Sequence, residues 1–222
     1  MKTDEKRRFK TLLYEQFAHI GKALASPHRL ELLDVLSQGE RSVEALAEET
    51  GMSVANASQH LQTLRMARLV ETRRAGVSIY YRLASDHVSE LWLKLRTCGE
   101  EHLAEVDQLV TTFLQDRASF RPVTVDELRE AMQDERVILL DVRPTPEYQA
   151  GHLPKARSVP VTELEARLAE LPKEREIVAY CRGPYCVFAD EAVALLRAHG
   201  YAARRLQEGV VEWRQRGFPI MR

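Results

Sequence analysis

The chain has 222 residues, of which 45% are hydrophobic and 29% are charged, and its formal net charge at pH 7 is −1. This length suits two small domains, and the near-neutral charge argues against a globally basic nucleic-acid binder, although a local basic patch would suffice for binding. No run of about 18 apolar residues occurs, so the sequence predicts no membrane span.

The N-terminal segment and the cysteines indicate a cytoplasmic protein. Residues 1–10 are charged and lack the apolar core of a signal peptide. Cys98, Cys181 and Cys186 are too few for a disulfide scaffold, and an odd number of cysteines without a secretion signal suggests reduced thiols.

Residues 9–83 show the pattern of a helical domain that ends in a β-hairpin. Apolar residues recur at helical spacing, and Pro27, Ser42 and Ser53 are suited to begin helices. After Leu69 the apolar residues alternate instead, as in a half-buried strand. We expect helices at 9–24, 27–38, 42–50 and 53–66, followed by a two-stranded wing at 69–72 and 77–83 with its turn at Ala75-Gly76.

A long helix is expected next, from about His87 to Leu114. Its apolar stripe is too long for a small domain alone, and such stripes usually pack against a partner chain or another long helix. We favour a homodimer seam, and packing on the first helix of the same chain is the alternative. The stripe comprises Val88, Leu91, Leu95, Cys98, His102, Val106, Leu109 and Phe113.

Residues 117–122 read as a short polar linker, so we place the domains at 1–117 and 123–222. Beyond the linker, the apolar runs 137–140 and 177–180 predict strands that are buried on both faces. Helical patterns at 126–132, 162–171 and 189–199 alternate with them, which predicts a parallel sheet covered by helices on both faces. The expected fold is an N-terminal, mainly α winged helix-turn-helix domain and a C-terminal α/β domain.

The helices 42–50 and 53–66 are joined by a tight Gly51-Met52 connection, which predicts a helix-turn-helix whose second helix enters the major groove of DNA. Five arginines and one acidic residue lie between Ser58 and Arg82, and a wing tip is suited to backbone contacts. A solvated charged face is the alternative. The candidate DNA-binding residues are Ser53, Asn56, Ser58, Gln59, His60, Gln62, Arg73 and Arg74.

Three stretches within residues 23–85 carry a family resemblance: ALASPHRL at 23–30, SQHLQTL at 58–64, and Leu69-Val70 running into Tyr80-Tyr81-Arg82. They resemble the ArsR (arsenic repressor-like) winged-helix family. The resemblance implies a homodimer that binds an inverted-repeat operator in double-stranded DNA and represses until an inducer arrives.

The sequence departs from the metal-sensing members of that family. The place where arsenic sensors carry a cysteine pair reads SVEAL at 42–46, without a thiol, and the zinc-ligand pattern of the last helix matches only in part. We expect no metal and no cofactor, with Cys98 as a small buried hydrophobe on the seam. A soft cation held by His87, Cys98 and His102 across a dimer is the less favoured alternative.

The segment YCRGPYCV at 180–187 follows a buried strand and precedes a helix. Amides of such a loop and the helix N-terminus carry partial positive charge, which favours a thiolate or a bound anion at Cys181. A cysteine phosphatase would need an arginine where this chain has Val187, and a core-filling cysteine is a poor match for such a turn. The candidate catalytic residues are Cys181, Arg182, Gly183, Pro184, Tyr185 and Cys186.

Residues 123–220 resemble the rhodanese family in LDVR at 140–143, Glu147-Tyr148, GHLPKA at 151–156, the loop at 180–186, and EGVVEW at 208–213 with GFPI at 217–220. The resemblance implies that Cys181 attacks a small sulfur donor such as thiosulfate or polysulfide and holds the sulfur as a persulfide. Asp141, Arg143 and His152 are expected to be structural.

Three positions depart from the rhodanese pattern. Lys155 and Glu208 stand where the family usually has glycine, and Cys186 occupies the last loop position, which is often arginine, serine or threonine. A persulfide on Cys181 could exchange with Cys186 to give a disulfide or polysulfide bridge. Equally, Cys186 could merely start the helix and point inward.

The sequence therefore predicts a repressor whose rhodanese domain carries sulfane sulfur on Cys181 and senses reactive sulfur species. The alternative is an active thiosulfate-type sulfurtransferase whose DNA-binding domain regulates or localises it. A metal-responsive repressor is less favoured. The sequence leaves open the operator, the regulated genes, the physiological donor and acceptor, and the direction of the response.

Overall fold

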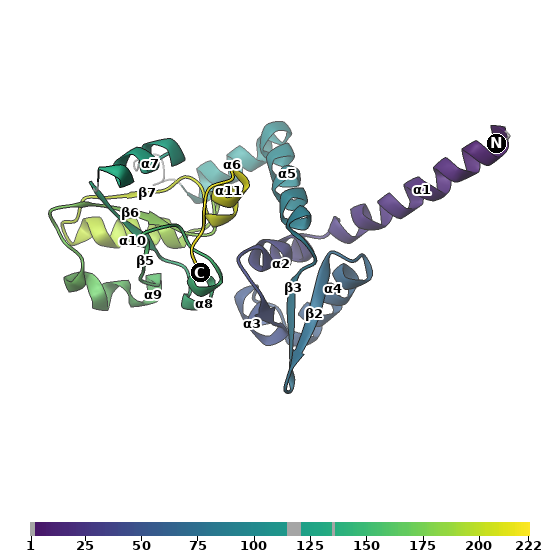
Figure 1. Cartoon of the computed structure of the whole chain (residues 1–222), viewed down its shortest axis with the longest axis horizontal. Helices are drawn as coiled ribbons and strands as arrows, with labels where there is room; N and C mark the ends of the chain where they lie inside the picture. Colours follow the sequence, from purple (N-terminus) through teal and green to yellow (C-terminus); the bar gives the residue numbers. More distant parts are fainter. Residues whose placement is uncertain (1–2, 115–120, 135) are drawn as a thin grey trace. The chain divides into compact units, whose positions relative to one another are not determined.

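The computed structural model describes residues 3–114, 121–134 and 136–222. Their contacts divide the chain into two compact units, Met1–Arg96 and Thr97–Arg222 (Figure 1). The linker predicted at 117–122 lies mostly at positions 115–120, outside the described residues. Within the described residues, the longest and most apolar helices still fall short of what a membrane crossing needs.

The first unit is a set of helices followed by a small antiparallel sheet. Its three strands are ordered β1-β3-β2, and the β2–β3 hairpin pairs Val70 with Leu83 and Ala75 with Ser78. Gly76 turns the hairpin with a φ of 62°, a conformation that glycine adopts without strain. The elements are α1 (Thr3–Leu24), α2 (Pro27–Ser37), β1 (Arg41–Ser42), α3 (Val43–Glu49), α4 (Val54–Met66), β2 (Val70–Ala75), β3 (Ser78–Leu83) and the first part of α5 (Asp86–His102), a helix that continues past Arg96 into the second unit.

The predicted helix starts are confirmed by their caps. The Ser42 hydroxyl accepts a hydrogen bond from Ala45 N at 3.3 Å, and the Ser53 hydroxyl accepts one from Asn56 N at 3.3 Å. Each such cap contributes about 1 kcal/mol to helix stability. The short strand β1, which the sequence pattern did not reveal, pairs with β3 and joins the wing to the helices.

The long helix predicted from His87 to Leu114 is interrupted, so that prediction is wrong in one respect. Helix α5 ends at His102, Leu103 is extended with φ −110° and ψ 99°, and α6 (Ala104–Phe113) follows. The His102 ring binds the Cys98 carbonyl through Nδ1 at 3.0 Å, which satisfies one of the last carbonyls of α5. Gly99, one turn before the break, also weakens the helix at this point.

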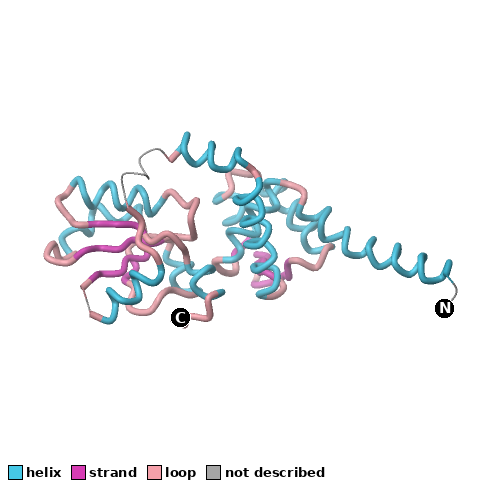
Figure 2. Tube along the Cα trace, turned by 90° about the horizontal axis from the view of Figure 1, so that it is seen from above, coloured by secondary structure: helices cyan, strands magenta, loops and turns pink. Residues whose placement is uncertain are grey.

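The second unit contains a four-stranded parallel sheet of order β5-β4-β6-β7, as predicted. Figure 2 shows its strands lying between helices. Its strands are β4 (Val137–Asp141), β5 (Arg157–Ser158), β6 (Glu176–Tyr180) and β7 (Ala203–Arg205). Its helices, besides α6, are α7 (Val125–Gln133), α8 (Thr145–Ala150), α9 (Val161–Leu164), a 3₁₀ turn at Glu165–Glu170, α10 (Phe188–Ala198) and α11 (Val210–Gln215).

Alternate residues of the central strands enter two separate apolar clusters, one on each face of the sheet. Ile138 and Leu140 pack with residues of α9 and α10, whereas Leu139 and Val178 pack with residues of α7 and α11. A strand buried on both faces explains the continuous apolar runs in the sequence. Parallel strands also bring the ends of β4 and β6 to the same sheet edge, where ligands of open α/β sheets usually bind.

Candidate functional site

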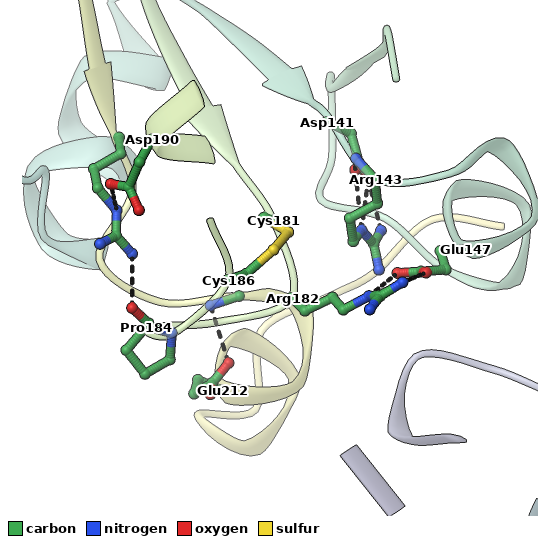
Figure 3. Close-up of a disulfide and its surroundings, with 11 residues drawn as sticks. Asp141, Arg143, Glu147, Cys181, Arg182, Pro184, Cys186, Asp190 and Glu212 are labelled. Carbon is green, nitrogen blue, oxygen red and sulfur yellow. Dashed lines mark hydrogen bonds and ion pairs between the residues drawn. A yellow bond between two sulfur atoms is a disulfide. The ribbon is translucent and has the colours of Figure 1, made fainter. Parts of the chain in front are cut away.

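The candidate thiol site lies at the C-terminal end of β6, in the loop that leads to α10 (Figure 3). Cys181 is 2% exposed, and Cys186 is half-buried just before α10 begins. The two residues form a disulfide with their Cα atoms 6.2 Å apart, inside the usual range of about 4.4–6.8 Å. The structure therefore brings the two predicted thiols together and shows them in the oxidised form.

Contacts other than the disulfide fix the shape of this loop. The Cys186 amide donates to the Gly183 carbonyl at 3.3 Å, and Arg205 Nη2 donates to the Pro184 carbonyl at 3.4 Å. Arg205 is itself 4% exposed, and its Nε lies 3.6 Å from Asp190 Oδ1. Sequence reasoning missed Arg205 and Asp190, because neither lies in a motif and an arginine on a short strand gives no distinct signal.

Gly209 makes a close backbone approach to the same loop. A β-carbon at this position would overlap the Arg182 carbonyl and lie 2.8 Å from Gly183 N. The sequence identified Gly209 as part of a rhodanese stretch but gave no reason for its being glycine. The structure supplies one, since the start of α11 packs directly on the peptide between Arg182 and Gly183.

Arg182 does not place its charge beside the sulfur. Its guanidinium makes a two-pronged ion pair with Glu147 of α8, with Nη2 2.6 Å and Nε 3.1 Å from Oε1 (Figure 3). The Glu147 side chain is fully buried, whereas that of Arg182 is 14% exposed. The contact between Arg182 and Glu147 ties the loop to α8.

Asp141, the last residue of β4, is the central acceptor of a buried hydrogen-bond network beneath the loop. Its carboxylate accepts hydrogen bonds from Arg143 Nη2 at 2.6 Å and from the Tyr180 hydroxyl at 2.6 Å. Arg143 also donates to the Gly151 carbonyl at 2.8 Å, and Tyr180 accepts from Leu153 N. Burial and the adjacent Asp141 charge hold the pKa of Tyr180 well above its usual value, so its hydroxyl stays a donor.

His152 lies at the side of this network. Its Nδ1 contacts the Tyr148 carbonyl at 2.9 Å, and its ring stacks on the Tyr148 ring with centroids 3.7 Å apart. Asp141, Arg143 and His152 thus join strand ends and loops to one another, in keeping with the structural role expected for them.

The candidate DNA-binding residues of the first unit lie on α4 and its N-terminal edge. Ser53, Asn56, Gln59 and Gln62 are exposed, whereas Ser58 and His60 are half-buried. Ala57, Leu61 and Leu64 form the opposite face and are completely buried in the first core. Helix α4 therefore presents its polar face outward, as the helix-turn-helix hypothesis requires.

Both candidate arginines of the wing lie on β2 and are exposed. Arg73 pairs with Glu40, with Nη2 2.5 Å from Oε1, and stacks on the Tyr80 ring at 4.9 Å. Arg74 donates through Nε to the Gly76 carbonyl at 3.3 Å. A phosphate contact by Arg73 would have to displace Glu40, whose pKa is lowered by the hydrogen bond from Arg73.

We expect Glu40→Gln to strengthen DNA binding several-fold. Arg73 would lose its competing carboxylate, and the negative charge beside the wing would disappear. The slope of log affinity against log salt should steepen by about 0.9 if Arg73 gains one phosphate contact. Fluorescence anisotropy with a labelled duplex at several salt concentrations measures both quantities. Glu170→Gln, which breaks an exposed pair with Arg167 in the other unit, is the matched control.

We expect His60 to make the stability of the first unit depend on pH. Its pKa is lowered by burial first, and then by the charges of His28 and Arg29. The unfolded chain therefore binds more protons just below pH 6.5, so stability is present above that value and falls as the pH drops toward the folded-state pKa. We expect His60→Gln to flatten this part of a pH series of urea unfolding curves. An equal slope in the variant would contradict the assignment.

Among the described residues, no group of three or more histidine, cysteine or acidic side chains is arranged to hold a metal ion. Cys98 is exposed and not disulfide-bonded in the single chain. The burial expected for Cys98 would therefore require a partner surface, and its place on a dimer seam stays a prediction.

Comparisons with known proteins assign both parts of the chain. The family model described as "Bacterial regulatory protein, arsR family" matches residues 26–72, and the model described as "Rhodanese-like domain" matches residues 124–216. The chain is 46% identical over 211 residues to the HTH-type transcriptional regulator Rv0324 of Mycobacterium tuberculosis, a match that covers 95% of this chain and 92% of that protein. The chain belongs to the ArsR family of bacterial regulatory proteins.

Two further similarities each concern one part of this ArsR-family chain. A sulfurtransferase of Allochromatium vinosum is 33% identical over 98 residues, which cover 43% of this chain and 90% of that protein. The solution structure of the homodimeric winged helix-turn-helix DNA-binding domain of Mb0332 from Mycobacterium bovis is 48% identical, covers 42% of this chain and 87% of that chain, and has a TM-score of 0.41. The ArsR-family chain is a DNA-binding transcriptional regulator with a rhodanese domain.

Proposed function

We propose that this ArsR-family regulator is a repressor whose rhodanese domain accepts sulfane sulfur on Cys181 and thereby senses reactive sulfur species. The observation that carries the proposal is the position of Cys181. It directly follows the central strand β6 of a domain matched by the rhodanese model, and it lies in a loop held by Arg205, Gly209 and the Arg182–Glu147 pair. Reactive thiols need such fixed surroundings.

The proposal includes a homodimer that binds a two-fold operator. Helix α1 supports it, because only Ala23 of its 22 residues is buried in the single chain. An apolar surface of this extent on one helix is the usual mark of an association face. The exposed apolar residues of α1 are Phe9, Leu12, Leu13, Tyr14 and Phe17, and those of α6 are Leu109 and Phe113.

We propose that the candidate DNA-binding residues contact the bases and phosphates of that operator. The exposed carboxamides of Asn56, Gln59 and Gln62 suit base edges in the major groove, while Arg73 and Arg74 suit phosphates beside it. The Ser53 hydroxyl already caps α4, so its role is to hold the helix start.

Sulfur loading is tested with thiosulfate and the reduced protein. Attack by Cys181 releases sulfite, so we expect one sulfite per chain from the wild type and none from Cys181→Ser. Cys98→Ser, which changes an exposed cysteine elsewhere, should behave as the wild type. Equal sulfite release from Cys181→Ser would contradict the proposal.

A second function is favoured by the 33% identity to the sulfurtransferase of Allochromatium vinosum, which spans 90% of that protein. In that case the rhodanese domain turns over, and the DNA-binding unit regulates or localises it. Repeated turnover of thiosulfate and cyanide to thiocyanate would support the enzyme. Loading that stops after one equivalent would support the sensor.

A further inference from the structure

We propose that the rhodanese domain reduces sulfane sulfur to hydrosulfide, with Cys186 as the thiol that converts the Cys181 persulfide into the Cys181–Cys186 disulfide. The substrate class is a small anion with a sulfane sulfur, such as thiosulfate or polysulfide. This inference rests on the proposed function, because Cys181 must first accept the sulfur. In this scheme the thiol that attacks the persulfide is Cys186 of the same loop, and no external sulfur acceptor is needed.

The placement of the two sulfur atoms carries the argument. They are bonded to each other in the structure, and both cysteines belong to the apolar cluster that packs beneath α10 (Figure 3). The atom that Cys186 reaches is Sγ of Cys181, which is the inner sulfur of a persulfide. Cys186 is bonded to that atom in the structure, so the attacking thiol comes from the same loop and needs no approach from solution.

The loop holds this geometry by contacts that do not depend on the disulfide. The Gly183–Cys186 hydrogen bond folds the loop back, Arg205 binds the Pro184 carbonyl, and Gly209 packs on the Arg182 carbonyl. The reduced loop therefore keeps the two thiols within reach of each other. Reactions between groups fixed in this way are strongly favoured over those with a thiol in solution.

The charge pairing beside the loop favours a short-lived persulfide. The guanidinium of Arg182, which would otherwise stabilise an anionic persulfide, is engaged by the buried carboxylate of Glu147. This arrangement leaves the persulfide reactive toward Cys186.

The chemistry balances without a further oxidant or reductant. The Cys181 thiolate attacks the sulfane sulfur of thiosulfate, the S–S bond of thiosulfate breaks, and sulfite leaves. The Cys186 thiolate then attacks Sγ of Cys181, the bond to the outer sulfur breaks, and hydrosulfide leaves with its electron pair. In sum, two thiols and one thiosulfate give one disulfide, one sulfite and one hydrogen sulfide. The dithiol loses two electrons and the sulfane sulfur gains them.

The test uses the full-length chain in a Cys98→Ser background, reduced, freed of reductant and kept without oxygen. After thiosulfate is added, intact mass, sulfite and trapped hydrosulfide are measured for the parent and for Cys186→Ser and Cys186→Ala. The parent should lose about 2 Da and release one sulfite and one hydrosulfide per chain. Both Cys186 variants should gain about 32 Da, release one sulfite and release no hydrosulfide.

The outcomes separate this inference from the proposed function. A parent that retains the added sulfur and releases no hydrosulfide, while the Cys186 variants also load, would overturn the resolving role of Cys186 and leave sulfur loading intact. Absence of both sulfite release and added mass in the Cys186 variants, with folding verified by circular dichroism, would overturn both proposals.

Discussion

Replacing Asp141 with asparagine should destabilise the rhodanese domain by about 3–5 kcal/mol, the usual cost of removing one partner from a buried ion pair. Asp141 and Arg143 are both completely buried, and the carboxylate accepts hydrogen bonds from four donor groups of Arg143 and Tyr180. An asparagine offers one acceptor oxygen and turns two N–H donors toward groups that are themselves donors. Urea unfolding, followed by the fluorescence of Trp213 in the same unit, measures the loss.

Two controls separate charge burial from a general effect of substitution. Glu170→Gln breaks an exposed pair with Arg167 and should cost much less, because solvent screens an exposed ion pair. The double variant Asp141→Leu/Arg143→Met removes both buried charges and should be more stable than Asp141→Asn. If Asp141→Asn lowered the free energy of unfolding no more than Glu170→Gln does, the buried network at the end of β4 would not stabilise the domain as proposed.

Replacing Gly209 with alanine should reduce the rate of sulfite release from thiosulfate on the order of 100-fold, because misplacement of a reacting group by about 1 Å has effects of that size. The new β-carbon would overlap the Arg182 carbonyl, so either the loop or the start of α11 must move. The cost in folding stability should be smaller, about 1–3 kcal/mol, as for other overpacked sites. Single-turnover kinetics with reduced protein measures the rate.

Gly217→Ala is the matched control for this prediction. Gly217 has a φ of 77° and open space where a β-carbon would be, so alanine there adds backbone strain of about 1–2 kcal/mol and no collision. Its sulfite release should be close to that of the wild type. If both variants lost activity equally, general destabilisation would explain the result and the contact at Gly209 would not.

The sequence predicted those parts of the fold that depend on local rules. The hairpin turn lies one residue later than predicted, at Gly76-Val77, because Ala75 ends β2 and pairs with Ser78. Serine caps placed the starts of α3 and α4, and apolar runs placed β4 and β6. Each of these signals arises within a few residues of the element that it predicts.

What the sequence did not predict depends on contacts between distant residues. The pairing of Arg182 with Glu147 joins positions 35 apart, and Arg205 reaches the loop from 21 residues away. The break at Leu103 was missed because the apolar stripe continues through it. A two-residue strand such as β1 has too few residues for any periodicity, and only its pairing with β3 defines it.

The site was predicted in part. The loop from Cys181 to Cys186 followed from its position between a strand and a helix, and whether the two cysteines meet was left open. Spacing alone could not decide that question, because a segment whose ends are 5 residues apart in sequence can either fold back or extend. The turn between Gly183 and Cys186 and the support from Arg205 decide it in the structure.

The most direct test of the central proposal is the affinity of the protein for an operator duplex, selected from a random library, before and after anaerobic treatment with inorganic polysulfide. If the reaction of sulfane sulfur with Cys181 is the signal, the affinity of the wild type and of Cys98→Ser should fall by about 5- to 150-fold, and that of Cys181→Ser should not change. An affinity that is unchanged in the wild type, or that falls equally in Cys181→Ser, would contradict the account.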